Sequence, residues 1–516
     1  MLRLLDDLKN YIPVVEKLIL EKEKGGIKRE VSLHRWWSKR YIYLYRSILA
    51  SFLLENDEKF YEALINPEIL DAHGLTYFEP LAGGGTGLVE ASLYNYNAYG
   101  IDINPLAVKI IEGYSALRND VNFNHINSII EEAKKELSPI WSYKGSTVSY
   151  VLITRDKVPS WVMTKKNPFR KVILCPHCGN FFESESNEEK VIPCPHCGNL
   201  VEVTIKPLYK PKNVVDYFGW KAFGIVVDKT LLFDKNWLEN RNRLLKEVEL
   251  EVDIDIYIEE LREGNRLIKA NITRPEKIFT KAQLLTFHRL AERAKELSQV
   301  ERLLLMLAAS DSVKTCSLLC RWYPPLNEPV PYAGGIKGYW VPEYTVETNP
   351  LAVHARSTVI SGIRNQMRIR KYKLRGEIHG MLGDALVKEY PKSDLIVIDP
   401  PYYKLSPSYS SLSFPHIVII NLFERISLKS ALNKEIGKER YFDNLLTILK
   451  KSKESLKSDG RIVLIINMKS EWKNLYEVIE KVGLEIVNKY EILGESPGYL
   501  GRSQHRTNII FILRPI

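Results

Sequence analysis

The sequence predicts an α/β protein in which a doubly wound, mostly parallel sheet ends in an antiparallel hairpin and is interrupted by a large insertion. Strands and helices alternate over residues 56–138 and again over 346–516, as they do where helices connect parallel strands. Two hydrophobic stretches, 483–492 and 505–514, close the chain with no full crossover helix between them. Roughly 200 residues separate the two alternating halves, which is too many for a structureless loop in a compact domain.

These patterns divide the chain of 516 residues into an N-terminal helical segment and a sheet domain that is split by the insertion. A chain of this length suits about three domains of roughly 150 residues each. We expect the helical segment at 1–55, the two halves of the sheet domain at 56–138 and 346–516, and the inserted substrate-recognition region at 139–345. Within the insertion, residues of about 170–205 contain two cysteine pairs, and about 278–320 have strong helical periodicity.

The composition is that of a soluble protein, with 45% hydrophobic and 26% charged residues. No apolar stretch approaches the roughly 20 residues that cross a bilayer. The N-terminal stretch mixes both charges with apolar residues at helical spacing, which indicates an amphipathic helix and not a signal peptide. We therefore expect a cytoplasmic protein. The net charge of +10 favours an acidic partner such as nucleic acid only weakly, because a lysine-rich surface explains it equally well.

A glycine-rich turn follows the first predicted strand of the sheet domain. The stretch FEPLAGGGTG places Gly83 and Gly85 between strand 76–81 and a helix, where the backbone can turn tightly and bring a helix N-terminus to a ligand. The next strand ends in Asp102, where a carboxylate can accept hydrogen bonds from ribose hydroxyls. Leu88 occupies the third glycine position of a dinucleotide fingerprint, so a nicotinamide cofactor fits poorly.

A second stretch competes for the ribose role. GIDINPLAV (100–108) is echoed by VETNPLAV (346–353), which makes Glu347 an alternative to Asp102. Both echoes are also typical of helix initiation, with Asn as the N-cap and Pro at the first helical position. We favour Asp102, because it directly follows the strand after the glycine turn.

A buried strand at 395–398 runs directly into Asp399, Pro400, Pro401 and Tyr402. Ligands of doubly wound sheets bind beyond the carboxyl ends of the strands, which is where this carboxylate stands. The two prolines hold the backbone extended and leave nearby carbonyls without competing amides. The aspartate and a rigid carbonyl could accept both hydrogens of an exocyclic amine, while the tyrosine stacks on its base with about 1–3 kcal/mol.

This arrangement suits methyl transfer to a nucleobase amine. An aspartate with a pKa of about 4 cannot deprotonate a neutral amine. Its expected role is to stabilise the positive charge that develops on nitrogen as the methyl group arrives.

The cysteine pairs predict a zinc ribbon. Cys175, Cys178, Cys194 and Cys197 lie in two CPHCG repeats with 15 residues between the pairs. A two-residue gap lets both thiolates of a pair reach one tetrahedral ion, and the following glycine permits the turn. Four thiolates make a closed, structural site. Within the pairs, His177 and His196 are expected to be exposed and not to bind the metal.

The motifs together resemble those of S-adenosylmethionine-dependent amino-methyltransferases. The order of SLHRWWSKR, the CPHCG pairs, FTKAQLL, LCRWYPP, ETNPL and DPPYY is similar to that in DUF1156-containing adenine-specific DNA methylases with a zinc ribbon, over most of the chain. The resemblance implies a class I methyltransferase (Rossmann-like) fold with Asp399, Pro400, Pro401 and Tyr402 as the catalytic motif. It also implies that the cofactor is held by Glu79, Gly83, Gly85, Asp102 and Asp384. A departure is Tyr41, where the family has proline.

The resemblance therefore implies a DNA methyltransferase that acts on adenine N6 of a nucleotide flipped out of the duplex. Its expected partners are DNA and the proteins of a restriction-modification or defence system. An RNA base methyltransferase and a catalytically idle DNA-binding protein of a defence or repair assembly remain alternatives.

Three further groups of residues each have two interpretations. His34 to Trp37, with Lys39 and Arg40, could line the methionine end of the cofactor or anchor the N-terminal helix. Arg321 and Trp322 could stack on a flipped base or close a loop. Basic residues could contact phosphate or be solvated, and they lie beside the cysteine pairs (Lys165, Lys166, Arg170, Lys171, Lys206, Lys210 and Lys212) and along 354–375.

Overall fold

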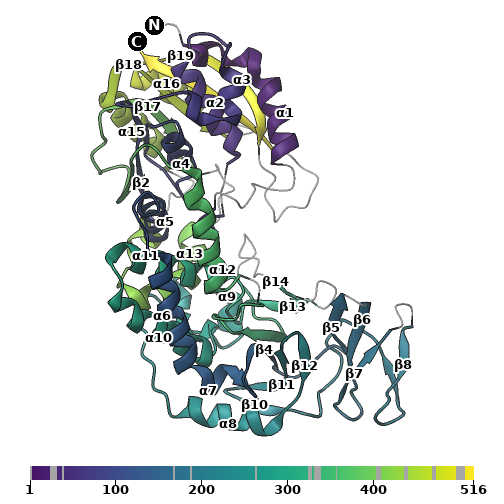
Figure 1. Cartoon of the computed structure of the whole chain (residues 1–516). Helices are drawn as coiled ribbons and strands as arrows, with labels where there is room; N and C mark the ends of the chain where they lie inside the picture. The colour runs from purple at the N-terminus through teal and green to yellow at the C-terminus, as the bar shows by residue number, and fades with distance from the viewer. Residues whose placement is uncertain are drawn as a thin grey trace. The chain divides into compact units, whose positions relative to one another are not determined.

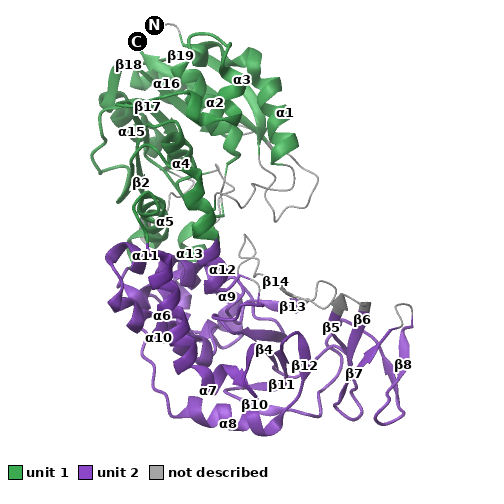
Figure 2. Ribbon diagram, viewed as in Figure 1, with its two compact units in different colours: residues 1–121, 365–413, 427–516 green, residues 122–364, 414–426 purple. Residues whose placement is uncertain are grey.

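The structure is a computed structural model. It describes residues 3–23, 32–37, 40–166, 169–185, 189–261, 264–323, 328–330, 339–355, 357–401, 408–434, 440–467, 472–494 and 506–516. The chain forms two compact units: unit 1 consists of residues 1–121, 365–413 and 427–516, and unit 2 of residues 122–364 and 414–426 (Figure 2).

Unit 1 contains a seven-stranded mixed sheet with the order β16-β2-β1-β17-β18-β20-β19. The first five strands are mutually parallel, and β20 is antiparallel to both β18 and β19. In sheet order, the strands are β16 (Ile378–Leu382), β2 (Asn97–Asp102), β1 (Thr76–Glu79), β17 (Ser393–Ile398), β18 (Leu456–Ile466), β20 (Arg506–Pro515) and β19 (Leu484–Gly494). The doubly wound sheet with a closing antiparallel hairpin is therefore confirmed.

Helices cover both faces of this sheet (Figure 1). On one face, apolar residues of α15 (Tyr441–Ser455) and α16 (Trp472–Val482) form a core cluster with the central strands. On the other face, α4 (Thr86–Leu93) packs on β2 and α5 (Pro105–Ala116) on β16, and the strand glycines Gly100 and Gly380 let Leu88 and Ile111 approach closely. Because β17 is buried on both faces, its residues 395–398 are all apolar, as in other parallel sheets.

The N-terminal segment packs on unit 1. It contains the 3₁₀ helix η1 (Leu4–Tyr11), α1 (Ile12–Lys22) and α2 (Ile42–Leu53), followed by α3 (Phe60–Ile65) and η3 (Pro67–Ile69). Asp6 accepts a bidentate ion pair from Arg461 of β18, at 2.9 and 2.8 Å. Two further elements of unit 1 are η8 (Arg370–Tyr372) and α14 (Lys429–Lys434).

Unit 2 contains a second, antiparallel sheet with the strand order β10-β11-β4-β15. In addition, β12 pairs with β11 and β3 pairs with β4. Its strands are β3 (Ser142–Tyr143), β4 (Ser146–Thr154), β10 (Val215–Tyr217), β11 (Trp220–Val227), β12 (Thr230–Leu232) and β15 (Tyr344–Thr348). Its helices are α6 (Phe123–Glu136), α7 (Ser138–Trp141), α8 (Lys235–Lys246), η4 (Ile258–Glu260), α9 (Asn265–Lys269), η5 (Pro275–Ile278), α10 (Lys281–Arg293), η6 (Ala294–Glu296) and α11 (Gln299–Ser312).

The cysteine pairs lie in small sheets of unit 2. A three-stranded sheet is formed by β5 (Trp161–Lys166), β6 (Phe169–Leu174) and β7 (Phe181–Ser184), and a hairpin by β8 (Val191–Pro193) and β9 (Leu200–Glu202). A further hairpin pairs β13 (Arg321–Tyr323) with β14 (Glu328–Val330). Trp322 is 2% exposed and lies edge-on to Tyr150, so it is a core residue in a strand, and neither a base-stacking surface nor a loop closure.

The unit boundaries differ from the expected ones. Unit 2 begins at Asn122 instead of 139, and its first stretch extends to Arg364 instead of 345. Two helices, α12 (Val359–Ile369) and α13 (Tyr409–Phe423), contain residues of both units. A continuous helix gives no local signal for such a change, because the same 3.6-residue periodicity continues across it. Among the described helices, none has the length and apolarity needed to cross a bilayer.

Candidate functional site

A cavity in unit 1 opens at the carboxyl ends of β1, β2, β16 and β17, where doubly wound sheets bind ligands. Six predicted site residues line this cavity, namely Gly83, Asp102, Asp384, Asp399, Pro400 and Pro401. Glu79 and Gly85 are not among its lining residues, and Tyr402 lies outside the described residues. The glycine turn and the segment Asp399-Pro400-Pro401, called here the Asp-Pro-Pro tip, are more than 300 positions apart and thus face one cavity.

The glycine turn is shaped around Trp36. Gly83 and Gly85 have φ angles of +51° and +77°, in the left-handed region that favours glycine. A Cβ atom at Gly83 would lie 2.9 Å from the indole Nε1 of Trp36, and one at Gly84 would lie 2.8 Å from the Trp36 side chain. Trp36 itself lines the cavity and stacks on Tyr409, with ring centroids 5.8 Å apart and planes inclined by 13°. The glycines therefore make room for a wall of the cavity.

Asp102 joins the turn to the next strand. Its Oδ2 accepts a hydrogen bond from Gly83 N at 2.8 Å, and its Oδ1 accepts one from Asn104 N at 2.8 Å. Asn104 Oδ1 accepts from Leu106 N at 3.0 Å, which caps α5 as predicted. Its Nδ2 donates to Ser413 Oγ at 2.8 Å, in the part of α13 that belongs to unit 1. These bonds fix the carboxylate that was predicted to hold a ribose.

Asp384 stands on the turn after β16, beside the end of β2. Its Oδ1 accepts from Leu386 N at 2.9 Å, and Gly383 N donates to the carbonyl of Asp102 at 3.0 Å. The two carboxylates therefore occupy neighbouring strand ends of the cavity wall, as expected for ligands of one nucleoside.

Glu79 is buried at the end of β1, with 2% of its surface exposed. It accepts a hydrogen bond from the hydroxyl of Tyr77. Burial raises the pKa of the Glu79 carboxyl to about 8, and repulsion from Asp399 acts in the same direction. The side chain is thus protonated at neutral pH and lies behind the cavity wall.

Gly87, in the first turn of α4, leaves no space for a side chain. A Cβ atom there would lie 1.8 Å from Glu79 Oε1 and 2.6 Å from the Tyr77 hydroxyl oxygen. We expect Gly87→Ala to lower the free energy of unfolding by about 1–3 kcal/mol, measured by chemical denaturation. Alanine is otherwise favoured over glycine inside a helix by about 1 kcal/mol, so a neutral or stabilising result would contradict this packing.

Asp399 forms a bidentate ion pair with Arg40. Arg40 Nε donates to Oδ2 at 2.7 Å, and Nη2 donates to Oδ1. The Arg40 side chain is 2% exposed and that of Asp399 16%. Strand β17 is therefore followed by a carboxylate whose charge is balanced by Arg40 of the N-terminal segment, which explains how a buried strand tolerates it.

Glu347 is not among the residues that line this cavity. It lies on β15 in unit 2, fully buried, and accepts hydrogen bonds from the Tyr217 hydroxyl and from Arg241 Nη2 at 2.7 Å. Asn349 Oδ1 accepts from Leu351 N at 2.9 Å, the same turn that Asn104 makes. No helix begins at Pro350, however, so helix initiation was the wrong prediction for this second echo. An asparagine turn alone does not specify a helix, because such turns also occur in loops.

The four predicted metal ligands come together in unit 2. Their Sγ atoms all lie within 4.8 Å of one another, with Cys175–Cys197 and Cys178–Cys194 each at 3.7 Å. Zinc–sulfur bonds of about 2.3 Å in a tetrahedron place sulfurs about 3.8 Å apart, so the four thiols fit zinc. The carbonyls of Cys175 and Cys194 each accept from the glycine four positions on, Gly179 and Gly198, at 2.8 Å.

The asparagines of the two CPHCGN repeats contact their own knuckle, and the histidines contact residues beyond the other one. Asn180 and Asn199 donate from Nδ2 to the sulfurs of Cys178 and Cys197, at 3.6 and 3.4 Å. Each histidine contacts a carbonyl just beyond the other knuckle, at 3.2 Å for His177 with Leu200 and 3.3 Å for His196 with Phe181. The histidines are exposed and outside the sulfur cluster, as expected from the sequence.

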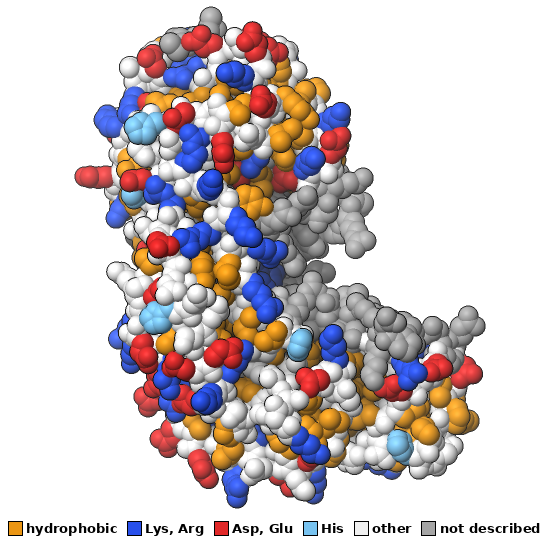
Figure 3. All heavy atoms as spheres, in the orientation of Figure 1, with side chains coloured by type: hydrophobic (Ala, Val, Ile, Leu, Met, Phe, Trp, Pro, Cys, Tyr) orange, Lys and Arg blue, Asp and Glu red, His pale blue; other side chains and the backbone are white. Residues whose placement is uncertain are grey.

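Most described basic residues beside the ribbon have partners within unit 2. Arg170 pairs with Glu183 and Glu185 at 3.3 and 2.8 Å, and Lys210 with Asp156 at 3.4 Å. Lys171 is 7% exposed, 5.3 Å from the ring centroid of Trp161. The side chains of Lys165 and Lys166 are not described. On the face of unit 2 that Figure 3 shows, Lys and Arg are interspersed with Asp and Glu.

In the part of the basic segment 354–375 that belongs to unit 1, two arginines also have acidic partners. Arg370 pairs with Asp120 at 2.7 Å, and Arg375 with Asp71 at 3.1 Å. These two arginines therefore already have acidic partners on the unit 1 surface, which lowers the expected contribution of this segment to phosphate binding.

No protein-family model matches the chain, and no curated protein matches it. Three solved structures to which the chain is similar are the mitomycin 7-O-methyltransferase MmcR (16% identity, TM-score 0.16, 30% of this chain and 39% of that chain), a TehB-like SAM-dependent methyltransferase from Corynebacterium glutamicum (17%, 0.16, 29% and 62%) and the B. subtilis M1A22 tRNA methyltransferase TrmK (11%, 0.16, 31% and 46%). The matched part spans less than two thirds of each of those chains. These TM-scores are too low to carry a conclusion, so the function proposed below rests on the geometry of the site and on the motif resemblance.

Proposed function

We propose that this protein is an S-adenosylmethionine-dependent DNA methyltransferase that modifies adenine N6, and that it belongs to the DUF1156-containing family that its motifs resemble. The observation that carries the proposal is the shared cavity. A glycine turn, carboxylates at two neighbouring strand ends and the Asp-Pro-Pro tip line it together.

The cavity wall fits the proposed cofactor. Asp102 and Asp384, at the ends of β2 and β16, suit hydrogen bonding to the ribose and the adenine. The turn at Gly83 presents the N-terminal end of α4, and Trp36 would cover the bound molecule from the side of the turn. When bound, the cofactor supplies a methyl group carried on a sulfonium.

The tip residues suit the target amine. The amine lone pair is delocalised into the base, so the nitrogen attacks well only when its hydrogens are held out of the ring plane. Asp399 and the carbonyl of Pro400 can accept these hydrogens, and Pro401 contributes no amide that would compete for that carbonyl. Asp399 would stabilise the positive charge that develops on the nitrogen as it accepts the methyl group supplied by the cofactor. The amine proton is then released to solvent.

A DNA base must leave the duplex to reach such a cavity, at a cost of a few kcal/mol. The net charge of +10 is compatible with a polyanion, although the described basic residues beside the ribbon are mostly paired. DNA is therefore favoured over RNA by the motif resemblance and not by the charge distribution.

The proposal is tested by incubating the protein with S-adenosylmethionine carrying a labelled methyl group and either duplex genomic DNA or total RNA. Digestion and mass spectrometry of the nucleosides should detect labelled N6-methyladenine from DNA. Asp102→Ala should raise the Kd for the cofactor, because the ribose loses its acceptor. Label in RNA nucleosides would favour the RNA alternative, and absence of label from both, with intact cofactor binding, would favour a catalytically idle protein.

A further inference from the structure

The Arg40–Asp399 pair joins two segments 359 positions apart at the proposed catalytic centre. The guanidinium binds the carboxylate edge-on through Nε and Nη2, and its Nη1 donates to Asn508 Oδ1 at 3.1 Å. Asn508 is fully buried at the start of β20, beside the carboxyl end of β18. Arg40 is thus fixed to the sheet on one side and to the tip on the other.

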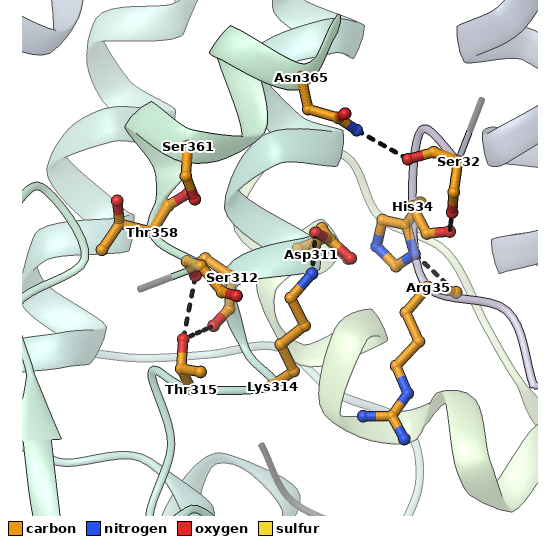
Figure 4. A network of polar contacts seen from close by, with 12 residues as sticks. Ser32, His34, Arg35, Asp311, Ser312, Lys314, Thr315, Thr358, Ser361 and Asn365 are labelled. Atoms are coloured by element: carbon orange, nitrogen blue, oxygen red, sulfur yellow. Dashed lines mark hydrogen bonds and ion pairs between the residues drawn. The ribbon is translucent and has the colours of Figure 1, made fainter. Parts of the chain in front are cut away.

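The backbone on either side of Arg40 is also held within unit 1. Asn365 Nδ2 donates to the carbonyl of Ser32 at 2.7 Å (Figure 4), and Leu33 N donates to the Tyr114 hydroxyl at 2.9 Å. After Arg40, the carboxylate of Glu23 accepts hydrogen bonds from the first amides of α2, at 3.0 and 3.1 Å. A side chain anchored on both flanks can orient its partner with little loss of entropy on binding.

Arg40 supplies the counter-charge of the Asp399 carboxylate at the tip. Glu79, which is protonated at neutral pH, adds no charge there. Among the described residues that line the cavity, Arg40 is the only cation. A guanidinium that binds edge-on uses one lone pair of each carboxylate oxygen, and each oxygen has two lone pairs. Asp399 can therefore accept from a substrate amine while Arg40 still holds it.

We propose that Arg40 is a positioning residue for the proposed methyl transfer: its guanidinium fixes the orientation of the Asp399 carboxylate, so that a lone pair left open on one of its oxygens faces the target amine. The inference rests on the proposed function. The alternative role for Arg40 is that of a latch. In this role Arg40 occupies the position of the target amine and must be displaced before the amine can bind.

The test measures kcat, KM for DNA and cofactor Kd in Arg40→Lys and Arg40→Met. We expect kcat to fall roughly 100-fold in Arg40→Met, the effect of about 1 Å of misplacement, with an unchanged cofactor Kd. Arg40→Lys should lose a similar factor, because a point charge does not reproduce the fork. In Arg40→Ala, ethylguanidinium should restore part of kcat and ethylammonium should not, a response that a purely structural role would not give.

The matched control is Arg461→Met, which removes a second bidentate arginine–aspartate pair between the N-terminal segment and the sheet. It should unfold at a lower temperature while kcat of the folded protein stays near the wild-type value. A wild-type kcat in Arg40→Met, or a raised one as a latch predicts, would overturn the positioning role. A wild-type protein that binds the cofactor but methylates no DNA would instead overturn the proposed function.

Discussion

Asp399→Ala should abolish methyl transfer and also lower the free energy of unfolding by about 3–5 kcal/mol, because it leaves the buried guanidinium of Arg40 without its counter-charge. The double variant Asp399→Ala/Arg40→Met should recover most of the stability, since both charges are then gone, but none of the activity. Chemical denaturation and methyl transfer measured on the same samples separate the two effects. The loss of activity is therefore interpretable only with the double variant beside it.

Asp6→Ala is the matched control for this experiment. Asp6 forms a bidentate pair with Arg461 whose side chains are 8–9% exposed, and neither residue lines the cavity. This variant should be destabilised and still transfer methyl groups. Normal transfer by Asp399→Ala would contradict the catalytic role of the tip, and unchanged stability would contradict the buried ion pair.

Removal of zinc should unfold the ribbon. Its core cluster consists of six buried residues, Ile173, Cys175, Phe182, Ile192, Cys194 and Val201, of which two are proposed metal ligands. So small a core cannot offset the conformational entropy of about forty residues, whereas a four-thiolate zinc site contributes on the order of 10–16 kcal/mol. After chelation, the amides of β6 to β9 should lose their protection from hydrogen exchange. Cofactor binding should persist, because its residues all lie in unit 1.

Two cysteine variants test whether the four-cysteine cluster binds the zinc. Cys194→Ser should reduce the zinc content, measured by elemental mass spectrometry, from one ion per chain to a weakly bound fraction. Cys316→Ala replaces a fully buried cysteine outside the sulfur cluster and should retain one ion. Full amide protection of the ribbon after chelation would contradict a metal-dependent fold.

The sheet of unit 1 could be predicted because its signals are local. Three of the central strands end at or beside an acid, namely β1 at Glu79, β2 at Asp102 and β17 before Asp399, and these residues mark the edge where ligands bind. The hairpin β19–β20 followed from the absence of a crossover helix. The cysteine cluster was equally predictable, because ligand spacing is a sequence property.

The electrostatics of the site could not be predicted, because they depend on contacts between distant segments. In the sequence, Arg40 follows several basic and aromatic residues, and nothing near it indicates that its partner is Asp399. Trp36 was equally consistent with an anchor of the N-terminal helix, and only the closeness of its indole to Gly83 shows it as a cavity wall. Glu347 carried the same local sequence as Asp102, and only the fold separates them, since Arg241 and Tyr217 occupy its oxygens.

The central claim is that the glycine turn and the Asp-Pro-Pro tip form one catalytic crevice. The most direct measurement is a crystal structure with a cofactor analogue that carries an amine in place of the methyl-sulfonium group. The account predicts its ribose at Asp102, its adenine near Asp384 and its amine within about 3 Å of an oxygen of Asp399 or Pro400. An analogue bound in another cavity, or with its amine directed away from Asp399, would contradict the account.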